Sequence, residues 1–312
     1  MTNFPAPVFE VLPRDLSAYR KGNVGIDYVH RFESGRPGPH VLVNALTHGN
    51  EFCGMVAATH LLDTGFRPKK GTLTVSFANV EAYESFDPAA PEASRLLVHN
   101  LNRIWSEKWL EGSEDSPELR RAREMRPVVA AADHILDLHS TLQAVPPFWV
   151  YPGYPRNAVA ALAIGRPDIH LVMPKGMGTG TPLIQHGRHG QEDGAGVALV
   201  AECGQHFLQA SADMAVAVTM DFLAHFGLAD RDPTAAPPGP QRRFELLDTP
   251  VIKTESFHFV RPVSGLETFA KGELIATDGP DEIRAPVDDC TIFMPARRAI
   301  VGREAVYLTR PL

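Results

Sequence analysis

Residues 39–51, PHVLVNALTHGNE, join a nearly continuous apolar run to two side chains, His48 and Glu51, that can bind a metal or transfer a proton. Such a run is typical of a strand buried on both faces of a parallel sheet. The next residues, 51–65, carry apolar side chains at helical spacing. A strand, a tight turn and a helix in this order place His48 and Glu51 at the carboxyl end of a strand, where open α/β sheets bind ligands.

The alternation of strands and helices continues along the chain. The patterns at 71–80, 133–140, 146–152 and 196–203 predict further strands. Those at 116–132 and 212–226 predict helices, with Ser116 and Ser211 as N-caps and Gly227 ending the second one. Strands that alternate with helices imply right-handed crossovers. We therefore expect an α/β fold, with an open, mostly parallel twisted sheet flanked by helices.

The composition changes at residues 230–243, DRDPTAAPPGPQRR, where four prolines and one glycine occur in a polar stretch. Such a stretch predicts a linker. Beyond it the helical period is lost, and short strand-like segments are broken by Gly, Pro and Asp. We expect a large domain at 1–232 and a small C-terminal all-β domain at 243–312.

The composition limits the classes of partner. The 312 residues carry a net charge of −7, which does not favour nucleic acid, because phosphate binding depends on Lys and Arg. The three cysteines are widely spaced and suggest no disulfide framework. The N-terminal residues lack a signal-peptide pattern, and no apolar run approaches the ~20 residues of a membrane helix. We expect a cytoplasmic protein without a membrane partner, and the sequence leaves open whether it forms a homo-oligomer.

Three side chains are candidate metal ligands. Catalytic zinc sites commonly use three His or Glu ligands and keep a fourth position for water. His48 and Glu51 lie three residues apart and face one side of a turn entering a helix, and His139 lies near the end of a predicted strand. Asp137, on the same strand face, either orients the imidazole of His139 or is an ordinary polar strand residue. Each of the three candidates taken alone is also compatible with an ordinary loop residue.

Two further groups can carry chemistry. Glu202 closes the apolar strand GVALVA, where partial desolvation would raise its pKa toward the range of a general base; the alternative is a cap just beyond the sheet. Asn102 and Arg103 can bind one carboxylate together, and Arg95 could reach the same pocket. The alternative for these arginines is a solvated surface.

Four motifs occur together in one order: HGNE at 48–51, NLNR at 100–103, DLHS at 137–140, and Glu202. This set resembles the succinylglutamate desuccinylase/aspartoacylase family, a branch of the zinc carboxypeptidase-like hydrolases. The resemblance covers residues 35 to 230 well and the C-terminal region more loosely. It implies that 1–232 is a zinc hydrolase catalytic domain and that the enzyme is a deacylase hydrolysing the amide bond of a small N-acyl amino acid.

The resemblance also implies a role for individual residues. His48, Glu51 and His139 would hold one Zn²⁺ per chain, and Glu202 would be the base that activates a water molecule. Arg95, seven residues before Asn102, would polarise the scissile carbonyl. Asn102 and Arg103 would hold a substrate carboxylate, and Tyr307 would close over the substrate from the C-terminal region.

Two departures from the family pattern affect the expected substrate. Asn100 stands where the aspartoacylases have an acid, and Glu192 stands where they have an arginine that binds the substrate's side-chain carboxylate. Either Arg188, in a longer loop, fills that role, or the role is absent from this chain. A neutral or basic acylated amino acid is therefore at least as plausible as an acidic one. A zinc carboxypeptidase acting on short peptides and an inactive binding module on the same scaffold remain alternatives.

Overall fold

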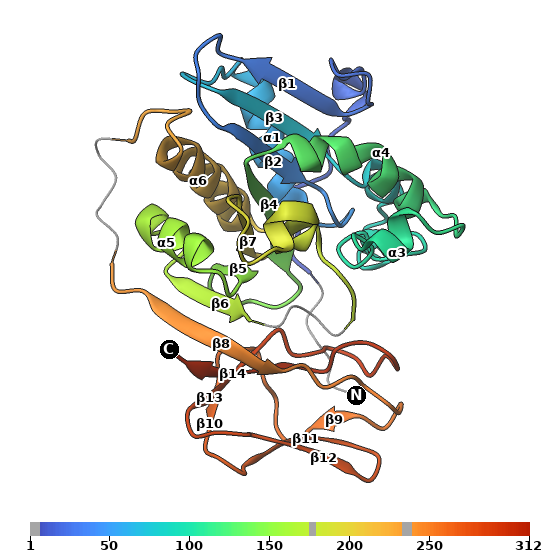
Figure 1. Cartoon of the computed structure of the whole chain (residues 1–312). Helices are drawn as coiled ribbons and strands as arrows, with labels where there is room; N and C mark the ends of the chain where they lie inside the picture. The colour runs from blue at the N-terminus through green and yellow to red at the C-terminus, as the bar shows by residue number, and fades with distance from the viewer. Residues whose placement is uncertain (1–6, 175–178, 233–238) are drawn as a thin grey trace.

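An eleven-stranded sheet with helices on both faces organises the computed structural model, which describes residues 7–174, 179–232 and 239–312 (Figure 1). The order of its strands is β1-β3-β2-β4-β7-β5-β6-β8-β14-β13-β10, and β12-β11-β9 form a second, small sheet. The strands are β1 Val29–Glu33, β2 His40–Ala45, β3 Thr72–Phe77, β4 His134–Thr141, β5 Phe148–Pro152, β6 Ile169–Met173, β7 Val197–Gln205, β8 Arg242–Asp248, β9 His258–Phe259, β10 Thr268–Phe269, β11 Leu274–Asp278, β12 Asp281–Arg284, β13 Cys290–Phe293 and β14 Tyr307–Pro311.

The α-helices of the described residues all precede the C-terminal strands. They are α1 Phe52–Asp63, α2 Val80–Glu84, α3 Glu107–Leu110, α4 Pro117–Ala131, α5 Pro155–Ile164 and α6 Gln209–His225, with short 3₁₀ turns η1 Ser17–Tyr19, η2 Ala93–Arg95, η3 Leu183–Gln185 and η4 Gly187–Gly190. None of the helices in this part of the chain has the length and apolar character needed to cross a membrane.

The predicted strands and helices are present, but the sheet is mixed, so the prediction of a mostly parallel sheet is wrong. The four strands β3, β2, β4 and β7 run parallel to one another. β5 then runs antiparallel to β7, because residues 142–147 between β4 and β5 are too few for a crossover helix. β1 and the C-terminal strands β14, β13 and β10 add further antiparallel pairs.

The C-terminal strands continue the main sheet, so a separate all-β domain is not confirmed. β8 pairs in parallel with β6, and β14, β13 and β10 follow it outward. Phe293 of β13 packs against Phe148 of β5 and Phe244 of β8, with ring centroids 5.3 Å apart in each pair. Residues 233–238 of the predicted linker lie outside the described residues. The division at 232 and 243 stays a prediction.

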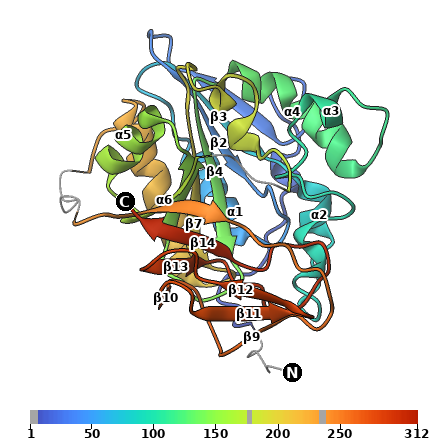
Figure 2. The same ribbon diagram turned by 60° about the horizontal axis from the view of Figure 1, so that its bottom comes forward.

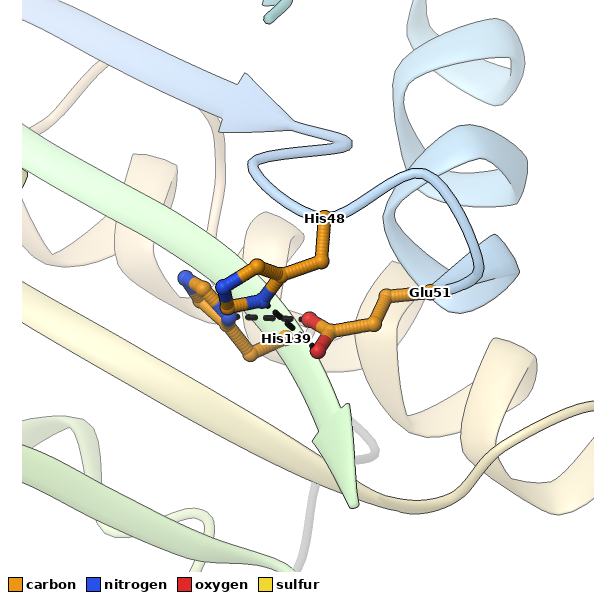
Figure 3. Close-up of side chains that lie close together, drawn as sticks. All are labelled: His48, Glu51 and His139. Atoms are coloured by element: carbon orange, nitrogen blue, oxygen red, sulfur yellow. Dashed lines mark hydrogen bonds and ion pairs between the residues drawn. The ribbon is translucent and has the colours of Figure 1, made fainter. Parts of the chain in front are cut away.

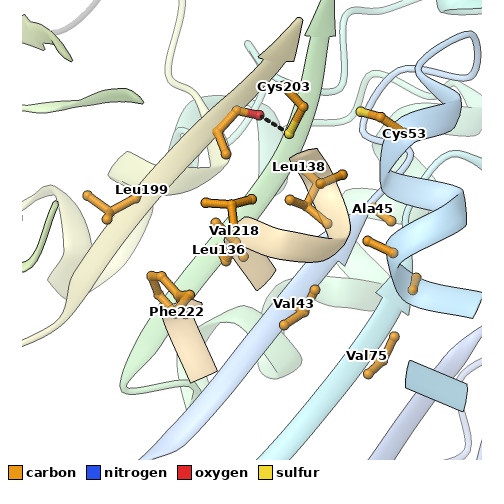
Figure 4. Close-up of a cluster of buried hydrophobic side chains, with 14 of the residues drawn as sticks. Val43, Ala45, Cys53, Val75, Leu136, Leu138, Leu199, Cys203, Val218 and Phe222 are labelled. Carbon is orange, nitrogen blue, oxygen red and sulfur yellow. Dashed lines mark hydrogen bonds between the residues drawn. The ribbon is translucent and has the colours of Figure 1, made fainter. Parts of the chain in front are cut away.

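Apolar side chains fill both faces of the sheet. One buried cluster lies between the sheet and the helices α1 and α6 (Figure 4). It includes Val43, Ala45, Leu136, Leu138, Leu199, Val218 and Phe222. A second cluster packs α4 against the opposite face and reaches Phe244 and Tyr307. Burial on both faces explains why the parallel strands are nearly continuous apolar runs.

Two of the three predicted helix-capping residues, Ser116 and Gly227, are confirmed. Ser116 Oγ accepts a hydrogen bond from the amide of Leu119 at 3.1 Å, so it is the N-cap of α4. Gly227 ends α6 with a φ of 77°. The prediction for Ser211 is wrong, because α6 begins earlier, at Gln209, and the Ser211 hydroxyl donates to the carbonyl of Gln205.

His170 of β6 gives the fold a predictable pH dependence. The imidazole is fully buried and lies between Tyr151 Oη at 2.9 Å and Gln241 Oε1 at 2.7 Å. Burial lowers the pKa of His170 to about 4. As the pH falls below 6.5, the His170 imidazole is therefore protonated in the unfolded chain before it is protonated in the folded one. The free energy of unfolding consequently decreases between pH 6.5 and 4.

We expect the free energy of unfolding of the wild type to fall more steeply than that of His170→Gln across this window, by up to ~1.4 kcal/mol per pH unit. Urea unfolding at a series of pH values measures both slopes. His258→Gln, which changes an exposed histidine, is the control and should keep the wild-type slope. Equal slopes for the wild type and His170→Gln would show that His170 does not titrate as stated.

Candidate active site

Three adjacent parallel strands bring the candidate catalytic residues together. His48 and Glu51 follow β2, His139 lies near the end of β4, and Glu202 lies near the end of β7. The register pairs His139 directly with Glu202. Because parallel strands end at one edge of the sheet, all four side chains meet there. Figure 2 shows the C-terminal strands β8 and β14 near the same edge.

His48, Glu51 and His139 form a buried group that could hold a metal ion. One ligand atom from each lies within 4.8 Å of the others, and each residue is at most 2% exposed. Figure 3 shows the two imidazoles converging on the Glu51 carboxylate. Oε1 of Glu51 lies 2.8 Å from His48 Nδ1, and Oε2 lies 2.8 Å from His139 Nδ1. Two imidazoles and a carboxylate are a donor set typical of catalytic zinc.

The remaining nitrogen of each imidazole is fixed by an oxygen that can only accept. His48 Nε2 lies 2.9 Å from Asn100 Oδ1, and His139 Nε2 lies 2.8 Å from Asp137 Oδ2. Both Nε2 atoms therefore donate their hydrogens, which leaves Nδ1 of each ring as the ligand atom. Asp137 thus orients the imidazole of His139, as one of the two interpretations of this residue predicted, and is not merely a polar strand residue. Asn100 supplies the same acceptor without a negative charge.

The pKa shifts of the three candidate ligands differ. Burial lowers the pKa of His139, but the carboxylates of Asp137 and Glu51 outweigh it, so this pKa lies well above its ordinary value and metal binding would displace a proton from the ring. Burial, followed by the positive charge of Arg95, lowers the pKa of His48 to about 4 and so favours the neutral imidazole that binds metals. Burial raises the pKa of Glu51, but the two imidazoles outweigh it, so this pKa lies well below its ordinary value. Arg95 Nη1 also donates to Glu51 Oε1 at 2.7 Å. Glu51 is therefore an ionised, buried carboxylate.

Glu202 faces this group from the neighbouring strand. Its Oε2 is buried and has no hydrogen-bond partner among the described residues. Burial is the main cause that raises the pKa of Glu202 to about 8. A carboxyl group with this pKa can accept and return a proton near neutral pH.

Two chambers that share lining residues adjoin the site. The inner chamber, of about 50 Å³, is lined by His48, His139, Asn102, Arg103 and Tyr307 together with apolar side chains. The outer cavity, of about 210 Å³, is lined by Glu51, Ser140 and His206 and by the 294–304 loop. Arg95, Glu202 and Met294 line both. We name these three residues the neck.

The substrate-binding candidates of the NLNR motif lie in the inner chamber. Asn102 Oδ1 accepts from the amide of Leu183 at 3.1 Å. Arg103 donates to Thr179 Oγ1, to the carbonyl of Asn102 and to Glu304 Oε1, at 3.0, 2.9 and 3.2 Å. These bonds use three of the five N–H donors of Arg103, so two remain for a ligand. Tyr307, 5% exposed, enters the chamber from β14.

The structure does not bring Arg188 to the site. Its guanidinium donates to the carbonyl of Ala132 and to Asp133 Oδ1, just before β4 begins. This position is at the opposite end of β4 from His139. Neither chamber includes Arg188 or Glu192 among its lining residues.

Gly49 allows two loops of the site to approach each other closely. A Cβ atom at this position would lie 2.3 Å from the carbonyl oxygen of Ser94 and 2.5 Å from Tyr83 N. The amide of Gly49 donates to the carbonyl of Arg95 at 3.2 Å. The glycine is required here by close packing, since its φ lies outside the left-handed region.

Sequence reasoning missed Glu118, a fully buried carboxylate of α4 that holds the loop between Arg95 and Asn100. Its Oε1 accepts from the amide of Leu97 at 2.6 Å, and its Oε2 accepts from the amides of Val98 and His99 at 3.3 and 3.2 Å. The sequence does show an acid in the first turn of the predicted helix. Its role could not be predicted from that position, because the amides that it binds lie about twenty residues away in the sequence. Ser140 and His206, whose side chains bond each other at 2.7 Å, were also missed.

Residues 37–176 match the model of the succinylglutamate desuccinylase/aspartoacylase catalytic domain. This segment belongs to that family. The family resemblance predicted from the motifs is therefore confirmed, and the segment contains His48, Glu51, Arg95, NLNR and His139. Glu202 and Tyr307 lie beyond the matched residues.

Individual relatives extend the comparison. A stretch of 114 residues is 33% identical to the N-acyl-aromatic-L-amino acid amidohydrolase (carboxylate-forming) of Xenopus laevis. It covers 34% of this chain and 35% of that protein, so the match spans about a third of the relative's length. The solved structure of succinylglutamate desuccinylase from Vibrio cholerae is similar with a TM-score of 0.70 at 18% identity, over 91% of this chain and 86% of that one.

The product-bound ectoine utilization protein of Ruegeria pomeroyi is similar with a TM-score of 0.65 at 16% identity, over 91% of this chain and 88% of that one. At these identities the likeness to solved structures shows the fold. It covers 91% of this chain and so extends beyond the matched segment.

Glu118 generates a stability prediction. Removing a buried carboxylate that accepts backbone hydrogen bonds leaves those amides unpaired, and each such bond contributes about 1.5–3 kcal/mol. Since three such bonds are lost, we expect Glu118→Ala to lower the free energy of unfolding by about 4–5 kcal/mol, the lower end of their sum, measured by chemical denaturation. Glu114→Ala removes a mostly exposed acid close to the start of the same helix and should change it by less than about 0.5 kcal/mol. Similar losses in the two variants would rule out the proposed role of Glu118.

Proposed function

We propose that this chain is a zinc-dependent hydrolase that cleaves the amide bond of a small N-acyl amino acid. One observation carries the proposal. The unpartnered carboxylate of Glu202 lies on the strand next to His139 and lines the same chamber as two imidazoles of a three-ligand metal group. The family of residues 37–176 and the names of its relatives support the same reaction class.

His48, Glu51 and His139 would hold the zinc ion. The donor set fits, because the three ligand atoms are buried, close together and oriented by Asn100 and Asp137. When bound, zinc supplies a Lewis acid that lowers the pKa of a water molecule from ~16 toward ~7 and polarises a carbonyl group.

Glu202 is the proposed general base. It accepts a proton from the attacking water while the carbon–oxygen bond forms. It then delivers this proton to the leaving nitrogen as the carbon–nitrogen bond breaks, so the products are a carboxylic acid and a free amino acid. Glu202 would be favoured in the carboxylate form that this role requires by a cation held at His48, Glu51 and His139.

Arg95 stabilises the negative charge that develops on the carbonyl oxygen. Among the residues that the structure describes, Arg95 makes a side-chain hydrogen bond only through Nη1, to Glu51, and its guanidinium lies in the neck beside Glu202. Its remaining N–H donors can therefore point at the reacting carbonyl. A fixed donor at this position acts mainly in the transition state, where it is most effective.

Asn102 and Arg103 would hold the carboxylate of the amino acid, with Tyr307 covering it. The rest of the inner chamber is apolar, and its volume of about 50 Å³ leaves little space beside that carboxylate. Arg188, the candidate for a second carboxylate, is bound elsewhere. We therefore propose a substrate whose amino acid part has a small, uncharged side chain.

Metal analysis tests the ligand assignment. We expect the purified wild type to contain about one zinc per chain, and His48→Ala and His139→Ala to lose it, because two ligands do not hold the ion tightly. His60→Ala, on the outer face of α1, is the matched control and should retain zinc. A wild type that binds no zinc would favour the inactive binding module. Unchanged zinc in either variant would reject that ligand.

Turnover tests the base. Glu202→Gln should keep its zinc and lose about 10²- to 10⁴-fold in kcat on N-acyl amino acids, because general base catalysis contributes that much. Glu81→Gln, at an exposed position of α2, should behave as the wild type. Full activity in Glu202→Gln would refute the assignment, and a preference for dipeptides over N-acyl amino acids would favour the carboxypeptidase alternative.

A further inference from the structure

The two chambers meet at the neck, which orients any substrate that binds as proposed above. Arg95 and Glu202 are the residues that act on the scissile amide, and both face the two chambers. If the amino acid carboxylate binds Asn102 and Arg103 in the inner chamber, the acyl group on the other side of the amide must extend into the outer cavity. This inference rests on the proposed function.

The sizes of the chambers then distinguish the two halves of the substrate. The outer cavity has about four times the volume of the inner one, 210 against 50 Å³. An acetyl group would leave most of the outer cavity unfilled. Its walls include Leu142, Val145 and Pro295, which suit the methylene groups of a longer acyl chain.

His206 is one of several polar residues in the lining of the outer cavity, which also includes Gln143, Ser264 and the arginines of the 294–304 loop. The His206 side chain is only 5% exposed, and its Nδ1 is bonded to Ser140 Oγ at 2.7 Å. Its amide donates to the carbonyl of Thr141 at 2.8 Å, which fixes the backbone. Within the described part of the chain, Nε2 makes no hydrogen bond, although the residue lines the outer cavity.

The Ser140 hydroxyl determines what Nε2 can do. When this hydroxyl donates to Nδ1, the ring proton lies on Nε2, and the neutral imidazole presents one fixed N–H donor to the cavity. Such a donor recognises an oxygen acceptor, and leaving it unpaired against a purely aliphatic chain is unfavourable. An acyl chain that carries a hydroxyl group should therefore bind more tightly than an aliphatic chain of equal length, because only the former accepts this hydrogen bond.

We propose that the outer cavity is an acyl-binding site for chains longer than acetyl, and that His206 determines its specificity by donating to an oxygen acceptor carried by the acyl chain beyond the scissile carbonyl. The class of ligand is an N-acyl amino acid with a hydroxyl, keto or carboxylate oxygen on its acyl group. His206 acts on the acyl half and takes no part in the chemical step.

Binding to the zinc-loaded Glu202→Gln protein tests this site without turnover. Calorimetry would give Kd for N-acetylglycine, N-butanoylglycine and the 3- and 4-hydroxybutanoyl analogues. Uncharged acyl groups are chosen so that the arginines of the 294–304 loop form no ion pair with them. We expect butanoyl to bind more tightly than acetyl, and one of the hydroxyl analogues to bind about fivefold more tightly than butanoyl, the factor of one net hydrogen bond.

Variants in the same Glu202→Gln background assign that preference. His206→Phe should reduce the ratio between the hydroxyl and butanoyl ligands to about one, whereas His206→Gln, which keeps a donor, should retain part of it. His258→Phe is the matched control at an exposed histidine and should keep the full ratio. If the ratio survives in a folded His206→Phe protein, or if acetyl binds more tightly than every longer chain, the proposal is wrong.

The outcome is separable from that of the proposed function. Should the wild type hydrolyse none of these ligands while the order of Kd values holds, the reaction would be wrong and the acyl-binding site would stand. If the wild type hydrolyses N-acetylglycine but longer acyl chains bind no more tightly than acetyl, the proposed reaction would stand and the acyl-binding site would be wrong.

Discussion

The hydrogen bonds around Asp137 are the constraint on which the rest of the site depends. This carboxylate is fully buried in the middle of the sheet, where an ion without partners would cost several kcal/mol. It accepts from Asn44 Nδ2 and Thr47 Oγ1 at 2.8 Å each and from His139 Nε2 at 2.8 Å. The same group therefore holds the turn after β2, which carries the candidate metal ligands His48 and Glu51, and fixes the imidazole from β4.

The network also explains a polar residue inside an apolar strand. Asn44 interrupts the run HVLVNA, and its Oδ1 accepts from Ser76 Oγ of β3 at 2.6 Å while its amide group donates to Asp137. Three neighbouring strands are thereby joined by side chains as well as by the backbone. A fully satisfied polar network of this kind specifies one register, because a shift of one residue would leave each of its members unpaired.

The sequence predicts that His48, Glu51, His139 and Glu202 lie together, because their positions depend on local rules; their roles stay predictions. The apolar runs at 39–46, 133–140 and 196–203 identify buried parallel strands, and parallel strands bring their carboxyl ends to one edge. What the sequence does not show is which end of the sheet a loop reaches. Arg188 lies in a loop before β7, and the loop keeps it near the start of β4. The antiparallel direction of β5 could have been predicted, because the six residues between β4 and β5 are too few for a crossover connection.

The C-terminal strands show why a linker in the sequence does not imply an independent unit. Short strands bounded by Gly and Pro carry no information about their partner, and here they extend the main sheet beyond β6. Their contribution to the site is specific. Glu304 accepts hydrogen bonds from Arg103 and Thr179, and Met294 is part of the neck. Burial raises the pKa of Glu304, but the charge of Arg103 and the hydrogen bond from Thr179 outweigh it, so this pKa lies below its ordinary value. Tyr307 closes the inner chamber from β14. The arginine proposed to bind the substrate carboxylate is thus held in place by a residue about 200 positions away. The candidate site is therefore built both from residues before position 232 and from the strands after 242.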